Sequence, residues 1–418
     1  METGQTMTRR LLDNLRNLGP GLLVAAAFLG PGTITTASTA GAAHGFQLLW
    51  ALVFGIAAAM VLQEMSARLG VVTREGLGEA LRTTYDSPAM TATAAVLVIS
   101  AIGVGGAAFE AGNITGAAIG VEASVPVSRT LWVLVVAVVA AALLWSGVYK
   151  AIERVLIALV VVMSVVFLVT AVIVRPDVGA LFAGFVPTMP SGALLTVVAL
   201  VGTTVVPYNL FLHASSVKEK WDAAVPTDRA LAGGRFDTGF SIGVGGLITL
   251  AVLTTAAAAF FGSGTSIEDA GTMARQLEPL LGPAARYFFA LGLLAAGISS
   301  AVTAPLASSY AICGVLGWSQ DLTAPRFRAV WVATLLIGTV FALVGGSPVQ
   351  AIVFAQATNG VLLPIVALFL VIVMNRGDLL GEHVNSVRAN LLGGIVVLVT
   401  AVLGIASLID AAGTLTGG

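Results

Sequence analysis

Gly30-Pro31-Gly32-Thr33 lies in the middle of the first apolar stretch of this 418-residue chain, and Val206-Pro207-Tyr208-Asn209 lies within the sixth. Lipid offers no hydrogen-bond partners to a helix that is interrupted at membrane depth. Such a break therefore persists only where protein or a water-filled cavity receives the freed backbone groups. Broken helices at matching positions in two halves of a chain point to the substrate site of a secondary transporter. The two breaks therefore predict a transporter.

Composition places nearly the whole chain in hydrocarbon. Hydrophobic residues make up 57% of it, charged residues 10%, and the mean hydropathy is +0.99, whereas about 25% of a soluble domain is charged. A net charge of -1 gives no sign of a nucleic-acid partner. Cys313 is the only cysteine, which excludes internal disulfides. Residues 1–17 are polar and basic without a signal-cleavage pattern, so we expect them to remain as a cytoplasmic segment.

Apolar stretches long enough to cross the bilayer, about 20 residues each, occur eleven times. They are 18–43, 46–69, 89–121, 128–147, 151–174, 190–216, 236–262, 284–316, 327–345, 349–374 and 387–411. Helices one to five (18–174) and six to ten (190–374) form halves of opposite topology because five is odd, which is an inverted repeat. The eleventh helix (387–411) is an addition. The prediction is an all-α, multi-pass membrane protein.

Basic residues predict the orientation. With the N-terminus inside the cell, 16 of the 20 Lys and Arg residues fall on the cytoplasmic side, and only Arg129, Arg175, Arg275 and Arg286 fall outside. Cytoplasmic loops carry this excess of Lys and Arg. We therefore expect a protein of the cell (plasma or inner) membrane with a cytoplasmic N-terminus and an external C-terminus.

Several stretches occur in an order and spacing that is specific as a set. They are GPGLLVAAA at 19–27, QLLW at 47–50, SARLG at 66–70, VPYNLFLH at 206–213, GLLAAGISS at 292–300, MNR at 374–376 and GEHVN at 381–385. With them the chain resembles the natural resistance-associated macrophage protein (NRAMP) family of proton-coupled divalent-metal transporters. The resemblance covers almost the whole length. It implies the LeuT-type 5+5 inverted repeat with helices 1 and 6 broken at the midplane.

The chain departs from this family at both breaks. The family's first break reads Asp-Pro-Gly-Asn, where this chain has Gly30 and Thr33. Its sixth-helix break has Met before the proline and His after it, where this chain has Val206 and Tyr208. Tyr208 can replace that histidine as a neutral hydrogen-bonding group, or serve in packing. The family's usual manganese and iron ligands are therefore largely missing.

The resemblance also implies what remains at the site. Thr203 aligns with an Ala that supplies a carbonyl ligand in the family, and Gln356 matches a polar position that can approach the ion. Together with Thr33 these groups offer neutral oxygens, and magnesium in particular gives up its water reluctantly. A cation bound here is expected to keep much of its hydration and to need a negative charge nearby. Magnesium or manganese fits this description.

Glu110 is the only carboxylate that the spans place deep in the bilayer, and a charge there indicates function by default. It can attract a hydrated cation and so join the metal site, carry a proton, or both; the alternative is a structural ion pair with Arg328. Asn113 follows on the same helical face. Family members carry acids near these positions and use them in proton transfer. His213 aligns with a family histidine on the proton route, although a packed, hydrogen-bonded histidine is the alternative.

Other polar residues have simpler interpretations. Glu64 and Arg68 are predicted to form an i, i+4 ion pair. Asp237 is predicted to cap the start of the seventh helix. Ser299, Ser300 and Thr303 either line the permeation path or allow close helix packing, and packing is favoured.

Three functions remain open from the sequence. The first is a transporter of a divalent cation. The second keeps the fold but moves a neutral or anionic solute, because helix N-termini at the breaks attract negative charge. The third is a non-transporting sensor, which the lack of a soluble output domain disfavours. No enzyme signature, cofactor motif or phosphate-binding loop is present, so ion gradients are the expected energy source.

Overall fold

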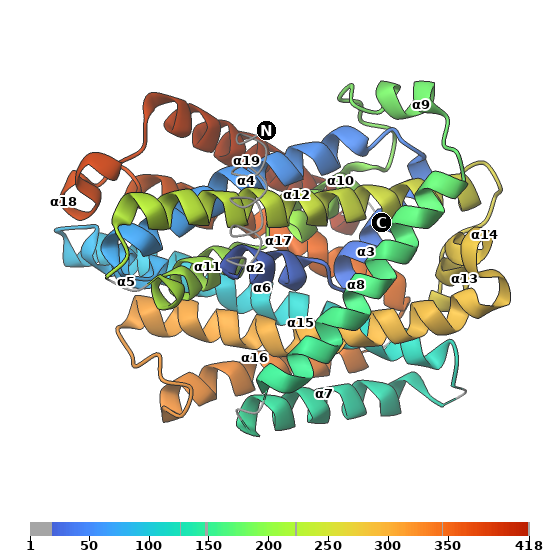
Figure 1. Ribbon diagram of the computed structural model, residues 1–418, viewed down its shortest axis with the longest axis horizontal. Coiled ribbons are helices and arrows are strands. Elements are labelled where there is room, and N and C mark those ends of the chain that lie inside the picture. Colours follow the sequence, from blue (N-terminus) through green and yellow to red (C-terminus); the bar gives the residue numbers. More distant parts are fainter. Residues whose placement is uncertain (1–18, 126, 147–148, 222–223, 345, 417–418) are drawn as a thin grey trace, which may run out of the picture.

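The computed structural model describes residues 19–416 except 126, 147–148, 222–223 and 345, with residues 149–153 and 414–416 described by their backbone alone. The predicted segment 1–17 lies outside the described residues. All regular elements in the described part are helices, and they run roughly side by side in one bundle (Figure 1).

Ten helices are long and apolar enough to cross a membrane, and a bent pair adds an eleventh span, in agreement with the predicted number. The bent pair is α2 (Pro20–Phe28) with α3 (Pro31–His44). The others are α4 (Leu49–Thr73), α6 (Pro88–Glu122), α7 (Arg129–Ser146), α8 (Tyr149–Ile173), α10 (Leu194–Thr204) with α11 (Pro207–Lys220), α12 (Thr227–Phe260), α15 (Ala285–Leu316), α16 (Pro325–Leu343), α17 (Pro348–Val373) and α19 (Val387–Thr416).

Short helices fill the connections. They are α5 (Leu77–Thr83), α9 (Val178–Ala183), α13 (Ala270–Ala274), η1 (Arg275–Leu277), α14 (Glu278–Leu281), η2 (Gly282–Ala284), α18 (Gly377–Leu380) and η3 (Gly381–His383). The connection between the sixth and seventh predicted spans (190–216 and 236–262) is shorter than the sequence suggests, because α11 runs to Lys220 and α12 already begins at Thr227.

Both expected breaks are present, but they differ in angle. α2 and α3 meet at 53°, whereas α10 and α11 continue as one span, Leu194–Lys220. The cause of each break is a proline in the first turn of the second helix. Proline has no amide hydrogen. The carbonyl of Ala27 therefore receives no helical hydrogen bond from Pro31, and that of Thr203 receives none from Pro207.

The first broken span lies in the centre of the bundle, between α12 and α15 (Figure 1). Its proline is seated directly against α6. A side chain at Gly116 of α6 would overlap the ring of Pro31, so only glycine permits this approach. Small residues at helix contacts are the usual means of close packing in lipid.

The predicted ion pair between Glu64 and Arg68 is confirmed, with 3.2 Å between Oε2 and Nη2. It belongs to a larger polar cluster at one end of α4. Arg235 of α12 lies 3.1 Å from the other oxygen of Glu64. Arg68 donates hydrogen bonds to the Asn385 side chain at 2.7 Å and to the His383 carbonyl at 2.8 Å. The cluster connects three parts of the chain.

The predicted role of Asp237 as a cap of its own helix is wrong. α12 begins ten residues earlier, at Thr227, and the Asp237 side chain is buried inside the bundle. It instead accepts hydrogen bonds from the backbone amides of Gly19, at 3.2 Å, and Gly21, at 3.0 Å, at the start of α2. Lys220 of α11 lies 3.8 Å from the same carboxylate. Asp237 thus caps another helix, whose first amides need an acceptor.

Replacing Asp237 should therefore weaken the start of α2. Asp237→Ala leaves two amides without an acceptor, and we expect it to lower the free energy of unfolding by about 2 kcal/mol, since a buried unpaired donor costs about 1–3 kcal/mol. Asp237→Asn keeps one acceptor oxygen and should have a smaller effect. Thermal melting of the purified variants measures this order. Equal melting temperatures for Asp237→Ala and the unmodified protein would contradict the capping role.

Candidate functional site

The two breaks meet through a pair of hydroxyl groups. Thr33 Oγ1, in the first turn of α3, lies 2.7 Å from Thr203 Oγ1, near the end of α10. Thr33 also donates to the carbonyl of Phe28, at the end of α2. Because the single hydroxyl proton of Thr33 goes to that carbonyl, Thr203 donates to Thr33. The structure thus joins residues 170 positions apart at the point where both helices are interrupted.

Gln356 of α17 reaches the first break. A side chain at Gly32 would overlap its amide, and a Cβ at Gly112 of α6 would lie 3.3 Å from its Nε2 atom. The Gln356 side chain is fully buried, and neither its oxygen nor its nitrogen has a hydrogen-bond partner. Buried polar atoms are normally paired. This amide is therefore available to a ligand at the break.

Glycine at position 30, where the resembled family carries an acid, lets two polar side chains come close to the first break. A Cβ at this position would lie 2.8 Å from Ser300 Oγ of α15 and 3.4 Å from Asn113 Oδ1 of α6. Both oxygens are buried and without hydrogen-bond partners. Ser300 therefore faces the break, although the sequence favoured a packing role for the serines of this helix.

Tyr208 connects the second break, which Val206 precedes, to α6. Val206 is buried and immediately precedes α11, whose first turn has no side-chain cap. The ring of Tyr208 packs edge-on against Phe109, with 5.5 Å between the ring centres. Phe109 is the neighbour of Glu110, so the aromatic pair places α11 beside the buried carboxylate.

Glu110 has no cationic partner within the described residues. Its side chain is fully buried, both carboxylate oxygens lack hydrogen bonds, and it lies against Gly338 of α16. The ion pair with Arg328 is not formed. Arg328 lies in the first turn of α16, about 15 Å along the helix from Gly338, and packs over the ring of Trp145 at 4.7 Å. Glu110 is therefore not part of the structural ion pair considered from the sequence.

His213 of α11 is held by α4. Its Nδ1 lies 2.8 Å from Oε1 of Gln63, and its Nε2 is buried without a partner. An amide oxygen only accepts, so the proton is on Nδ1 and Nε2 is left as an acceptor. The Gln63 contact was not foreseen, because nothing in the sequence spacing relates residues 150 positions apart.

The predicted site residues on the broken spans and on α6 and α17 are closed to solvent. Thr33, Val206, Tyr208 and His213 are each 1% exposed, and Thr203, Gln356, Glu110 and Asn113 are 0% exposed. The described residues contain no group of three or more His, Cys, Asp or Glu side chains that could hold a metal. A cation at the breaks would therefore depend on hydroxyl, amide and carbonyl oxygens with one carboxylate nearby.

A further polar cluster lies beside the middle of α3. Gln276, in η1, is fully buried and donates to Ser38 Oγ of α3 at 3.0 Å and to the carbonyl of Met273 at 2.9 Å. It also accepts a hydrogen bond from Thr255 of α12 at 3.2 Å. No sequence pattern indicates this contact, because Gln276 stands alone in a connecting segment.

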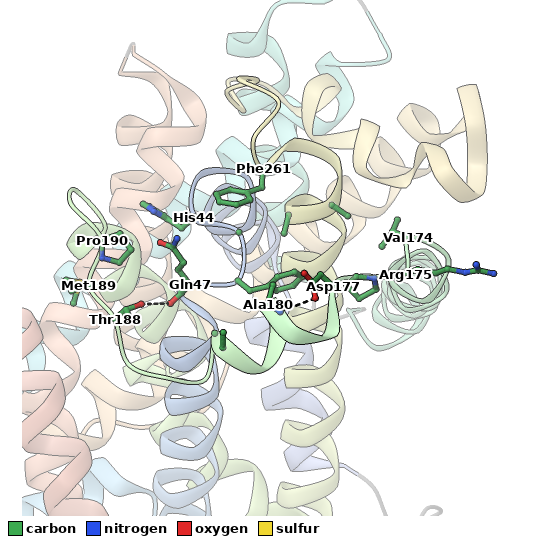
Figure 2. Close-up of a pocket in the computed structure, with 17 residues that line it drawn as sticks. His44, Gln47, Val174, Arg175, Asp177, Ala180, Thr188, Met189, Pro190 and Phe261 are labelled. Carbon is green, nitrogen blue, oxygen red and sulfur yellow. Dashed lines mark hydrogen bonds between the residues drawn. The ribbon is translucent and has the colours of Figure 1, made fainter.

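A separate cavity of about 960 Å³ lies at the C-terminal end of α3, near the ends of α8 and α12 (Figure 2). It is bordered by His44, Gln47, Asp177, Thr188 and Phe261, among others. None of the residues predicted for the substrate site lines it.

Comparison with known proteins places this arrangement in a family. The family described as "Natural resistance-associated macrophage protein-like" (Nramp) matches residues 21–410, with both breaks inside the matched region. The chain belongs to the Nramp family. It is 30% identical over 391 residues to the divalent metal cation transporter MntH of Klebsiella pneumoniae (strain 342), and the match covers 92% of each protein.

Solved structures agree with this Nramp assignment at the level of the fold. The Eremococcus coleocola manganese transporter aligns with a TM-score of 0.79 and 20% identity, covering 96% of this chain and 88% of the other. MhsT in complex with L-phenylalanine aligns with a TM-score of 0.56 and 16% identity, covering 94% and 98%. The fold is the LeuT type, as the sequence resemblance implied. The chain is thus a multi-pass membrane protein.

The unpaired amide of Gln356 leads to a stability prediction for this Nramp chain. Gln356→Leu removes two buried polar atoms that have no partners, so we expect a melting temperature equal to or higher than that of the unmodified protein. Thr358→Val, two residues away on α17, serves as the control: this half-buried hydroxyl already bonds the Phe354 carbonyl within its own helix. A clear loss of stability in Gln356→Leu would mean that the amide has a structural partner.

Proposed function

We propose that this Nramp chain moves a divalent metal cation across the membrane at the point where the two broken spans meet. The observation that carries this proposal is the contact of the Thr33 and Thr203 hydroxyls across both breaks, beside the unpaired amide of Gln356. The unpaired amide oxygen of Gln356 and the hydroxyl oxygens, which keep free lone pairs, are ligands that a transported ion can use. The family, whose curated relatives include divalent metal cation transporters, supports the same substrate class.

The ligand chemistry favours a hard ion that keeps part of its water. The hydroxyl and amide oxygens at the breaks are neutral, and no thioether stands at the positions of Val206 or Tyr208 to select soft transition metals. Neutral oxygens compensate poorly for the loss of water from a divalent ion. Magnesium or manganese, bound with some of its hydration shell, is therefore the proposed cargo.

Coupling to an ion gradient is assigned to Glu110, with Asn113 beside it on α6 and His213 on α11 as further members of the ion route. A buried carboxylate without a cation attracts positive charge. Arg328 has no part in this route, since it packs on Trp145. The proton is the coupling ion that the family resemblance implies.

Alternating access is proposed to use the two breaks as hinges. The buried site residues correspond to a closed conformation, from which either end of the bundle must open. The excess of basic residues at one set of loops supports a cytoplasmic N-terminus and an external C-terminus. The two halves of the inverted repeat, 18–174 and 190–374, are proposed to move relative to each other.

One observation favours the alternative of an anionic or neutral solute. α3 and α11 both begin at the breaks, and neither has a side-chain cap at its N-terminus. Uncapped helix N-termini carry partial positive charge and bind anions. Under this alternative, bicarbonate or a small carboxylate would raise the melting temperature of the protein and divalent cations would not. A non-transporting sensor would bind its ligand without flux.

Uptake into proteoliposomes tests the proposed cargo and site together. With Mn²⁺ or Mg²⁺ outside, we expect saturable uptake that falls about tenfold or more in Thr203→Val, because that change removes one of the two hydroxyls at the breaks. Thr204→Val is the matched control: its hydroxyl bonds the Leu200 carbonyl within the same helix. Absence of flux for every divalent ion would reject the proposal, and equal losses in both variants would reject the site.

A change that replaces the carboxylate of Glu110 by an uncharged amide of the same size tests the coupling. We expect Glu110→Gln to remove the pH dependence of cation uptake, because the variant can neither bind nor release a proton at this position. Glu122→Gln, an exposed acid at the end of the same helix, should retain it. Uptake measured over a pH series provides the comparison, and an unchanged pH profile in Glu110→Gln would exclude the carboxylate from coupling.

A further inference from the structure

A further cavity, of about 540 Å³, lies where α6 ends and α15 begins. Sites for small molecules commonly measure roughly 300–1,000 Å³. Three charged side chains border this cavity: Arg275 of η1, Glu278 at the start of α14 and Arg286 in the first turn of α15. None of the residues proposed for the cargo site or the ion route borders it. The cavity is therefore separate from the site at the breaks.

The three charges around this cavity are not paired with one another. Arg275, Glu278 and Arg286 are exposed, and none of the ion pairs in the described part of the chain includes them. Opposite charges that border one cavity without pairing suit a ligand that carries both charges. Arginine binds phosphate through charge-assisted hydrogen bonds, and a carboxylate accepts hydrogen bonds from an ammonium group. A phosphate next to an ammonium group is such a ligand.

The guanidinium of Arg286 is held in position by the residue that follows it. Its Nη2 atom donates a 2.8 Å hydrogen bond to the hydroxyl of Tyr287. The guanidinium carbon also lies over the Tyr287 ring, 4.6 Å from the ring centre. A guanidinium has five N–H donors in a fixed fork, so donors remain for a second acceptor. A phosphate matches the geometry of that fork.

Basic residues are scarce at the end of the bundle that holds this cavity. Of the 20 Lys and Arg residues, the sequence places four outside the cell, and two of these four, Arg275 and Arg286, border the cavity. Loops outside the cell generally carry few basic residues. Two arginines at one external cavity therefore favour an anionic group as their partner.

Apolar side chains continue from the cavity along the start of α15. Tyr287, which borders the cavity, Phe288 and Leu291 are 54%, 43% and 49% exposed, whereas Phe289 is fully buried. Because α15 is one of the membrane-spanning helices, its exposed apolar side chains face lipid. Tyrosine near the end of a span typically lies at the level of the lipid headgroups. The cavity is thus placed to receive a headgroup whose acyl chains lie along α15.

We infer that this cavity binds the headgroup of a phospholipid that carries a primary ammonium next to its phosphate, as phosphatidylethanolamine does. Arg275 and Arg286 bind the phosphate, and Glu278 accepts hydrogen bonds from the ammonium. The acyl chains lie against the exposed apolar side chains at the start of α15.

Such a lipid connects the segment before α15 to α15 itself. Arg275 directly precedes Gln276, whose buried amide donates to Ser38 of α3. A headgroup bound by both Arg275 and Arg286 therefore stabilises the position of the segment that contacts α3. An effect of the lipid on uptake rests on the proposed transport function, whereas the binding of the lipid does not.

Thermal melting in detergent tests the binding by itself. The purified protein is titrated with phosphatidylethanolamine, phosphatidylglycerol or phosphatidylcholine at constant pH and ionic strength. We expect a saturable rise in melting temperature at the lowest concentration with phosphatidylethanolamine. Phosphatidylglycerol has no ammonium for Glu278, and the quaternary ammonium of phosphatidylcholine has no N–H to donate. Soluble phosphoethanolamine should require a concentration about tenfold higher or more, because it lacks the acyl chains.

Substitutions at the cavity test each contact. Arg275→Gln and Arg286→Gln should each weaken the apparent affinity for phosphatidylethanolamine about tenfold, because each removes a charge-assisted hydrogen bond to the phosphate. Glu278→Gln should bind phosphatidylethanolamine and phosphatidylglycerol equally. Arg129→Gln is the matched control, since this arginine, also expected outside, hydrogen-bonds the Gly346 carbonyl and does not border the cavity.

Two outcomes would overturn the inference. One is an equal response to all three lipids, or a response to phosphatidylethanolamine that survives the combined change of Arg275→Gln and Arg286→Gln. The other is a response to soluble phosphoethanolamine at the same concentration as to the lipid, which would assign the cavity to a soluble phosphate compound instead.

Uptake of Mn²⁺ into liposomes with and without phosphatidylethanolamine separates this inference from the proposed function. Faster uptake with the lipid, lost in Arg286→Gln but kept in Arg129→Gln, supports both. Uptake that is indifferent to the lipid, in a protein whose melting is also indifferent to it, overturns the lipid site and leaves divalent transport intact. A retained lipid-dependent rise in melting temperature with no flux of any divalent ion rejects the transport proposal but supports the lipid site.

Discussion

The structure depends on one constraint: backbone groups that a helix break frees inside the bilayer must find partners there. Pro31 and Pro207 each remove an amide donor from the middle of a span. Thr33 donates a hydrogen bond to the Phe28 carbonyl at the end of α2 and accepts one from Thr203. The two breaks therefore stabilise each other. The buried oxygens gathered at the breaks are thus a consequence of how the two spans are stabilised, and the proposed use of the site for an ion builds on that chemistry.

Close packing around the breaks serves the same constraint. Gly116 lets α6 approach Pro31, and Gly32 and Gly112 accept the amide of Gln356 from two sides. With larger residues at these positions, α6 and α17 would be pushed away and the polar groups at the break would face lipid or empty space. The tight packing therefore keeps Asn113, Gln356 and Glu110 within reach of the interrupted span.

Much of the fold could be predicted from the sequence because lipid imposes simple rules. The eleven spans follow from the length of apolar stretches, and both breaks follow from prolines flanked by glycine or valine. The meeting of Thr33 and Thr203 follows from the symmetry of the two halves. The partners of Asp237 and His213 could not be predicted, nor that Glu110 lacks a cationic partner in the described part of the chain, because each depends on how distant helices meet. Arg328 was misjudged for the same reason: its aromatic neighbour Trp145 lies on another helix.

The two halves of the first broken span have separate anchors on the same neighbour. Asp237 of α12 binds the beginning of α2, while Thr255 of α12 is connected through Gln276 to Ser38 in the middle of α3. These two points are 18 residues apart, about 27 Å along an α-helix. α12 is therefore in contact with α2 and α3 at two separate points, on either side of the break at Gly30. Under the proposed alternating access, one half of the span moves while the other stays bound to α12, and water enters from one side only.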